Sequence, residues 1–120
     1  MTTVISVRMT YTLERAVRVN ADRSRMGVPV IIRLILEHAL CGRYNFSGLP
    51  DAQEFLDAKL DIRLSEDLNL KLRTESERLG VSLSVYIRKI LYAYYTKRLV
   101  FVEKDGRYTL EENHDQKKSA

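Results

Sequence analysis

The 120-residue sequence predicts a mainly α-helical protein with a short two-stranded antiparallel β-ribbon and a C-terminal β-hairpin. Three observations predict this fold class. The chain contains an internal repeat, and each copy changes from a hydrophobic period of two to a helical period. A turn signal, Asp105-Gly106, lies between β-rich flanks near the C-terminus. The first two observations predict two similar units, and the third predicts the hairpin.

The internal repeat becomes visible when the chain is displaced by 55 positions against itself. Residues 5–40 then align with residues 60–95 without a gap, and nine of the 36 aligned pairs are identical. These pairs are Arg8/Arg63, Leu13/Leu68, Arg18/Arg73, Arg23/Arg78, Val30/Val85, Ile32/Ile87, Arg33/Arg88, Ile35/Ile90 and Leu36/Leu91. The two units therefore share one pattern of secondary structure.

Each unit opens with a half-buried strand, because apolar and polar residues alternate over residues 5–9 and 60–64. Thr12 and Ser65 are the expected N-caps of the helices that follow. Gly80 suits the left-handed position after the first helix of the second unit. In the first unit, Gly27 stands at the cap of the second helix and Pro29 in its first turn.

The second helix of each unit is apolar nearly all round, over residues 30–39 and 85–95. Such a helix must be buried on most sides. One strand and two helices of about 36 residues are too small to supply that cover, whereas two units packed together are large enough. The repeat therefore predicts that the units share one core, as an intrachain pseudo-dimer.

These patterns divide the chain into five segments. Residues 1–43 form the first unit, residues 44–58 a linker with a short helix near 51–56, and residues 59–98 the second unit. Residues 99–112 form the hairpin, and residues 113–120 are expected to be a disordered tail.

Composition and charge narrow the class of protein. One cysteine, Cys41, excludes an internal disulfide and favours a reducing cytoplasm. No apolar run reaches the roughly 18 residues of a membrane span. The net charge is +4, and residues 1–43 and 59–98 each carry +4 while the remaining segments are acidic. The two units are therefore the expected site for an anionic partner.

Residues 60–95 resemble a ribbon-helix-helix domain of the kind found in Arc, MetJ and CopG. The resemblance lies in the alternating strand with Arg63, the Ser65 cap, the Leu79-Gly80-Val81-Ser82 turn with Ser84, and Tyr86-Ile87-Arg88. Residues 5–40 resemble the family more loosely, because Arg25 stands at the turn glycine and Gly27 and Pro29 replace the two serines. The resemblance implies a tandem ribbon-helix-helix protein whose two strands pair antiparallel.

The resemblance further implies a transcription regulator, repressor or activator, that reads a specific double-stranded DNA site with its ribbon in the major groove. Side chains on the polar face of the ribbon are then expected to contact bases, namely Ser6, Arg8, Lys59, Asp61 and Arg63. The starts of the second helices are expected to contact phosphates through Gly27, Val28, Ser82, Leu83 and Ser84. A homodimer or higher oligomer on DNA is a further expectation.

Several of these residues have a structural alternative. DNA phosphates repel a carboxylate, so a local ion pair is the favoured interpretation of Asp61. Arg33 and Arg88 lie within the apolar helices and are expected to be structural. Three tyrosines in the last helix are interpreted as packing residues because of their helical spacing, namely Tyr92, Tyr94 and Tyr95.

We find no pattern that predicts an enzyme, a metal site, a cofactor or a small-molecule substrate. His38, His114 and Cys41 have no metal-ligand spacing, and no nucleophile pairs with either histidine. Two other functions stay open. One is an antitoxin-like protein that masks a toxin with residues 99–120 and regulates its own operon, and the other is an architectural accessory of conjugation or partition. The small size and tandem form suit a virus or plasmid.

Overall fold

The computed structural model describes residues 2–52 and 54–114, which form four α-helices and two small antiparallel sheets. The protein is mixed α/β and compact, with a radius of gyration of 13.9 Å. In chain order the elements are β1 (Thr2–Met9), α1 (Tyr11–Arg23), α2 (Val28–Leu40), the 3-10 turn η1 (Phe46–Gly48), β2 (Ala58–Ser65), α3 (Glu66–Arg78), α4 (Leu83–Tyr95), β3 (Leu99–Lys104) and β4 (Arg107–Glu112).

The boundaries of the helices match the internal repeat residue for residue. Displaced by 55 positions, α1 coincides with α3 and α2 coincides with α4. The expected cap Ser65 accepts a hydrogen bond from the Leu68 N–H at 3.1 Å. The expected cap Thr12 was wrong, because Thr12 lies inside α1 and the cap is Thr10. Thr10 has the extended backbone that a cap needs, and its Oγ1 accepts from the Leu13 N–H at 3.0 Å.

The first sheet pairs β1 with β2 within the chain, and its strands are longer than the sequence predicted. The antiparallel register puts Ser6 opposite Asp61, Arg8 opposite Lys59 and Val4 opposite Arg63. Alternation holds along both strands, so one face is polar and exposed and the other is buried. The buried face carries Val7, Met9, Leu60, Ile62 and Leu64.

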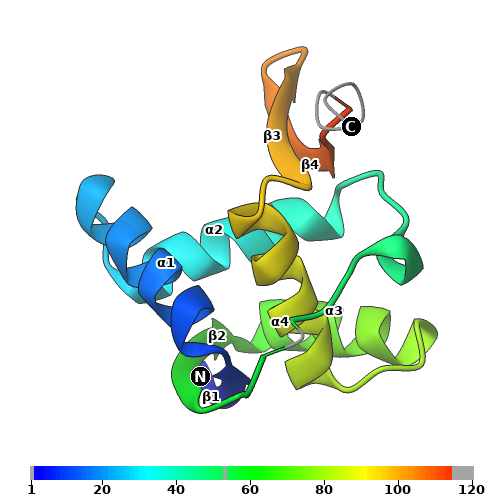
Figure 1. The fold of residues 1–120 in the computed structure, drawn as a ribbon. Coiled ribbons are helices and arrows are strands. Elements are labelled where there is room, and N and C mark those ends of the chain that lie inside the picture. Colours follow the sequence, from blue (N-terminus) through cyan, green and yellow to red (C-terminus); the bar gives the residue numbers. More distant parts are fainter. Residues whose placement is uncertain (1, 53, 115–120) are drawn as a thin grey trace.

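The core lies between this sheet and the helices. Helices α2 and α4 pack against each other near the centre, α4 also packs on β1, and α1 also contacts β2 (Figure 1). Each half of the chain therefore covers apolar surface of the other half. The second helices supply the fully buried centre of this core through Ile32, Ile35, Leu36, Ile87, Ile90 and Leu91. Helix α2 is less enclosed than its composition suggests, because Val30 in its first turn remains 46% exposed.

The short helical turn of the linker lies at Phe46–Gly48, earlier in the chain than the expected 51–56. The described residues of 51–56 are not helical, and the only helical turn in the described part of the linker is η1. Phe46 of η1 stacks on Tyr86, which fixes that turn against α4. Asp51 is held by Arg88, whose Nε and Nη2 atoms donate to its carboxylate at 3.0 and 2.7 Å. These two contacts hold the linker along α4. The contact with Arg88 fixes Asp51 in a non-helical segment.

The C-terminal hairpin is confirmed, with β3 and β4 paired around Asp105-Gly106. Both turn residues have positive φ, 54° and 77°, as a two-residue hairpin turn requires. The hairpin stands at the opposite end of the molecule from the β1–β2 ribbon (Figure 1). Asn113, the first residue of the expected disordered tail, hydrogen-bonds the Arg98 and Lys97 carbonyls, and residues 115–120 lie outside the described residues.

Candidate nucleic-acid interface

The outer face of the β1–β2 ribbon gathers the five side chains that the sequence predicts for base contact. All five are exposed, and none is covered by a helix. They are Ser6, Arg8, Lys59, Asp61 and Arg63. Two paired strands present them on one surface because alternate residues of a strand point to the same side. The buried opposite face holds that surface rigid against the core.

The two ends of this face differ in charge. At one end Arg8 lies directly opposite Lys59, so two cations are adjacent. At the other end Arg63 lies opposite Val4, which is 52% exposed. The outer face therefore presents a strongly cationic end and an end that combines one cation with an apolar side chain. A homodimeric ribbon would have two equal ends instead.

The centre of the face is occupied by a hydrogen bond between the strands. Ser6 Oγ donates to Asp61 Oδ1 at 2.5 Å. The expected local ion pair at Asp61 was wrong, because among the described residues its partner is this hydroxyl and not a cation. This hydrogen bond uses only Oδ1, so the second oxygen of the Asp61 side chain remains able to accept a hydrogen bond.

Strand β1 is fastened from behind by α4. Ser84 Oγ donates to the Ser6 carbonyl at 3.4 Å, and Arg88 Nη1 donates to the Arg8 carbonyl at 3.4 Å. These carbonyls belong to Ser6 and Arg8, the two residues of β1 that are expected to contact bases. The structural role expected for Arg88 is confirmed, since it is 9% exposed and joins β1 to the linker.

The Arg88–Asp51 pair is electrostatically strong. Its hydrogen bonds with Arg88 lower the pKa of Asp51 below the ordinary value, and the same contact raises the pKa of Arg88. Arg88 therefore stays charged, and Asp51 remains ionised at neutral pH. Sequence reasoning gave Arg88 a structural role but missed Asp51, because an acid in an irregular linker carries no pattern that names its partner.

The N-termini of α4 and α2 differ in what they offer an anion. Ser82 caps α4 and is exposed, and its hydroxyl already accepts from the Val85 N–H at 3.2 Å. Leu83 is 8% exposed, so its side chain is buried and it offers an anion only its backbone N–H. Gly27 caps α2 without a side-chain hydrogen bond, and Val28 is half-buried behind it. Both helix starts carry backbone N–H groups without an intrahelical partner, which can bind an anion.

Other chemistry is sparse in the described part of the chain. Over residues 2–52 and 54–114, no group of three or more His, Cys, Asp or Glu side chains is arranged to hold a metal ion. His38 Nδ1 lies 2.7 Å from the Leu34 carbonyl, and its ring packs edge-on to Phe101. None of the helices in the described residues is long and apolar enough to cross a membrane.

Comparison of the chain with models of protein families, with curated protein sequences and with solved structures finds no match.

Proposed function

We propose that this protein is a sequence-specific double-stranded DNA-binding regulator of transcription with a tandem ribbon-helix-helix arrangement in one chain. In this proposal, residues 2–40 and 58–95 are the two ribbon-helix-helix units, and the β1–β2 ribbon enters the major groove. The observation that carries the proposal is the exposed outer face of this ribbon, with Arg8 beside Lys59 and Arg63 beyond Asp61.

The chemistry of that face fits base edges. A major groove admits a two-stranded ribbon, and every base pair presents there a distinct set of donors and acceptors. Arg8, Lys59 and Arg63 suit the two acceptors of guanine, and the free oxygen of Asp61 suits the amino group of cytosine. The N–H groups at the starts of α2 and α4 suit the flanking phosphates and would fix the register of the ribbon on the duplex.

Alanine substitution of the outer arginines tests the proposal. Binding is measured by footprinting on the upstream region of the gene and on sites selected from random duplexes. Arg8→Ala and Arg63→Ala should each weaken specific binding by about 1–3 kcal/mol and leave the circular dichroism spectrum unchanged. Arg107→Ala is the matched control, because Arg107 is an exposed arginine on the distant hairpin. Full affinity and sequence preference in both ribbon variants would contradict the proposal.

Salt dependence separates DNA binding from a protein-masking function such as that of an antitoxin. About four to six phosphate contacts imply a log–log slope of affinity against salt of roughly −4 to −5. Selection from random duplexes also separates a regulator from an architectural accessory, since only the regulator enriches one short sequence strongly. A slope near zero, or no enrichment, contradicts regulation through this face.

A further inference from the structure

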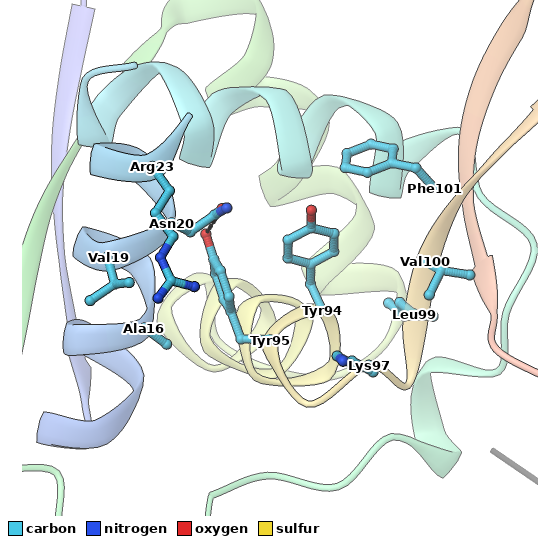
Figure 2. A pocket seen from close by; sticks show the side chains of 10 residues that line it. All are labelled: Ala16, Val19, Asn20, Arg23, Tyr94, Tyr95, Lys97, Leu99, Val100 and Phe101. Carbon is cyan, nitrogen blue, oxygen red and sulfur yellow. Dashed lines mark hydrogen bonds between the residues drawn. The ribbon is translucent and has the colours of Figure 1, made fainter. Parts of the chain in front are cut away.

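A shallow groove with a volume of about 530 Å³ lies between α1, the C-terminal end of α4 and β3. Figure 2 shows Val19 on the α1 side, Leu99 and Phe101 on the β3 side, and two tyrosines of α4 between them. The Tyr95 hydroxyl donates to Asn20 at 2.8 Å, so that edge of the groove is held in place. The groove is mainly apolar and lies open to solvent.

Two cations border this groove, namely Arg23 at the end of α1 and Lys97 after α4. Both are exposed, and neither forms an ion pair with an acid in the described residues. An apolar surface bordered by unpaired cations fits an apolar side chain that acids flank.

The same chain carries exposed aromatic side chains beside acids at the other end of α1. Phe55 in the linker is 90% exposed, and Tyr11, the first residue of α1, is 60% exposed. They share a surface depression with Glu54 and Asp57. These four residues, the linker knob, combine two exposed aromatic rings with two carboxylates. A phenylalanine exposed to this extent is a large apolar surface without cover.

We propose that the linker knob of one molecule docks in the α1–β3 groove of a second copy of this chain. Phe55 occupies the apolar groove, and Glu54 and Asp57 meet Arg23 and Lys97. Charge complementarity selects the occupant, because the chain itself presents an acid-flanked aromatic segment in an extended linker.

The placement of the two surfaces suits a closed dimer. The knob lies at the first residue of α1, and the groove begins near Ala16 and continues to Arg23. Helix α1 has 13 residues and is therefore about 20 Å long. A two-fold axis across the middle of α1 brings each knob to the groove of the other molecule, so both contacts form at once.

Sedimentation velocity of the full chain without DNA tests this interface independently of the proposed DNA binding. The wild type should show a concentration-dependent monomer–dimer equilibrium. Phe55→Ser should raise the dimer dissociation constant by about 30-fold or more, the size of the effect at an interface hot spot. Leu70→Ser is the matched control, because Leu70 is 65% exposed on α3 and should leave the equilibrium unchanged. Circular dichroism checks that each variant stays folded.

A charge exchange sharpens the test. Arg23→Glu with Lys97→Glu, and separately Glu54→Lys with Asp57→Lys, should each shift the chain to monomer. An equimolar mixture of the two variants should dimerise again, because each groove then meets a knob of opposite charge. A wild type that stays monomeric at all concentrations would overturn the proposal, as would a dimer that survives Phe55→Ser or a mixture that fails to associate.

Discussion

Residues 2–40 and 58–95 adopt matching elements with different residues at the points where the backbone turns. Between the helices of the second half, Gly80 takes the left-handed conformation at φ 72°, and Ser82 caps α4. Arg25 takes the equivalent conformation at φ 55° in the first half, and Gly27 caps α2 without a side chain. The shared core thus enforces a turn that the first half forms at higher conformational cost.

The halves also differ in how they are fastened to the ribbon. Arg88 of α4 reaches both Asp51 and the carbonyl of Arg8, whereas its counterpart Arg33 in α2 has no ion pair within the described residues. Ser84 donates to the Ser6 carbonyl, and the equivalent position in α2 is Pro29, which has no N–H and no polar side chain. Side-chain hydrogen bonds therefore anchor β1 to α4, and the two halves are not equivalent.

The largest expected effect comes from separating the halves. A fragment of residues 1–43 should lack a cooperative thermal transition, because Ile35, Leu36 and Val7 lose the cover that the second half gives. The fragment 59–98 keeps Gly80 and the Ser82 cap between its helices and is expected to regain cover only as a homodimer. Circular dichroism melts and sedimentation measure both. A well-folded monomer of 1–43 would contradict the shared core.

The next largest effect tests the anchor that only the second half possesses. Asp51→Asn should lower the free energy of unfolding by about 2–3 kcal/mol near neutral pH, because it leaves the buried Arg88 charge poorly paired. Since the pKa of Asp51 is lowered in the folded state, the wild type loses this stabilisation as the pH falls below about 4. The difference between the proteins should therefore shrink in acid. Urea titrations across pH measure it, and a difference that is independent of pH would contradict the ion pair.

A smaller effect concerns the turn between the helices. Arg25→Gly should stabilise the protein by about 0.5–1 kcal/mol, because glycine adopts positive φ without the steric cost that arginine pays. Gly80→Ala should destabilise it by about 1 kcal/mol. A Cβ atom at Gly80 meets no atom within 4 Å, so this loss is conformational and not a collision. Chemical denaturation of both variants decides the point, and changes of the same sign would refute it.

The smallest effect concerns the helix cap. Gly27→Ser should add a few tenths of a kcal/mol, about the difference between these residues at an N-cap. Gly27 has the backbone of Ser82, with φ and ψ of −69° and 150° against −71° and 158°. A Cβ atom there lies 3.7 Å from Pro29 Cδ, an ordinary contact. The reciprocal change Ser82→Gly is the control and should cost a similar amount in thermal melts. Destabilisation by Gly27→Ser would show that the caps are not equivalent.

The elements that could be predicted from the sequence are those with a periodic local pattern. Strand alternation, together with the repeat, predicted the two strands, whereas the register that places Ser6 opposite Asp61 comes from the structure. The repeat also indicates the correct N-cap of α1, because Thr10 aligns with Ser65, the N-cap of α3. The position of Thr12 directly before Leu13 led to the wrong choice. The linker was harder, because its path depends on Asp51 meeting an arginine 37 positions away, and no periodicity encodes such a contact.

The outer face of the ribbon was predictable in composition but not in its internal hydrogen bonding. Alternation alone assigns Ser6, Arg8 and Arg63 to the exposed side. The hydrogen bond from Ser6 to Asp61 depends on the strand register and on the side-chain rotamers, and alternation specifies neither. The exposure of Phe55 could likewise not be predicted, because a phenylalanine in a linker is equally consistent with packing on the core.

Base-by-base substitution of a footprinted site is the most direct test of the proposal that two unequal halves form one ribbon that reads DNA. Arg8 lies opposite Lys59 at one end of the ribbon, and Arg63 lies opposite Val4 at the other. A single chain should therefore read a short asymmetric sequence with a fixed polarity. Arg8→Ala should relax preference at one side of it and Arg63→Ala at the other, each by about 1–3 kcal/mol. A sequence that is perfectly palindromic under one ribbon, or the same base positions affected by both variants, would contradict the account.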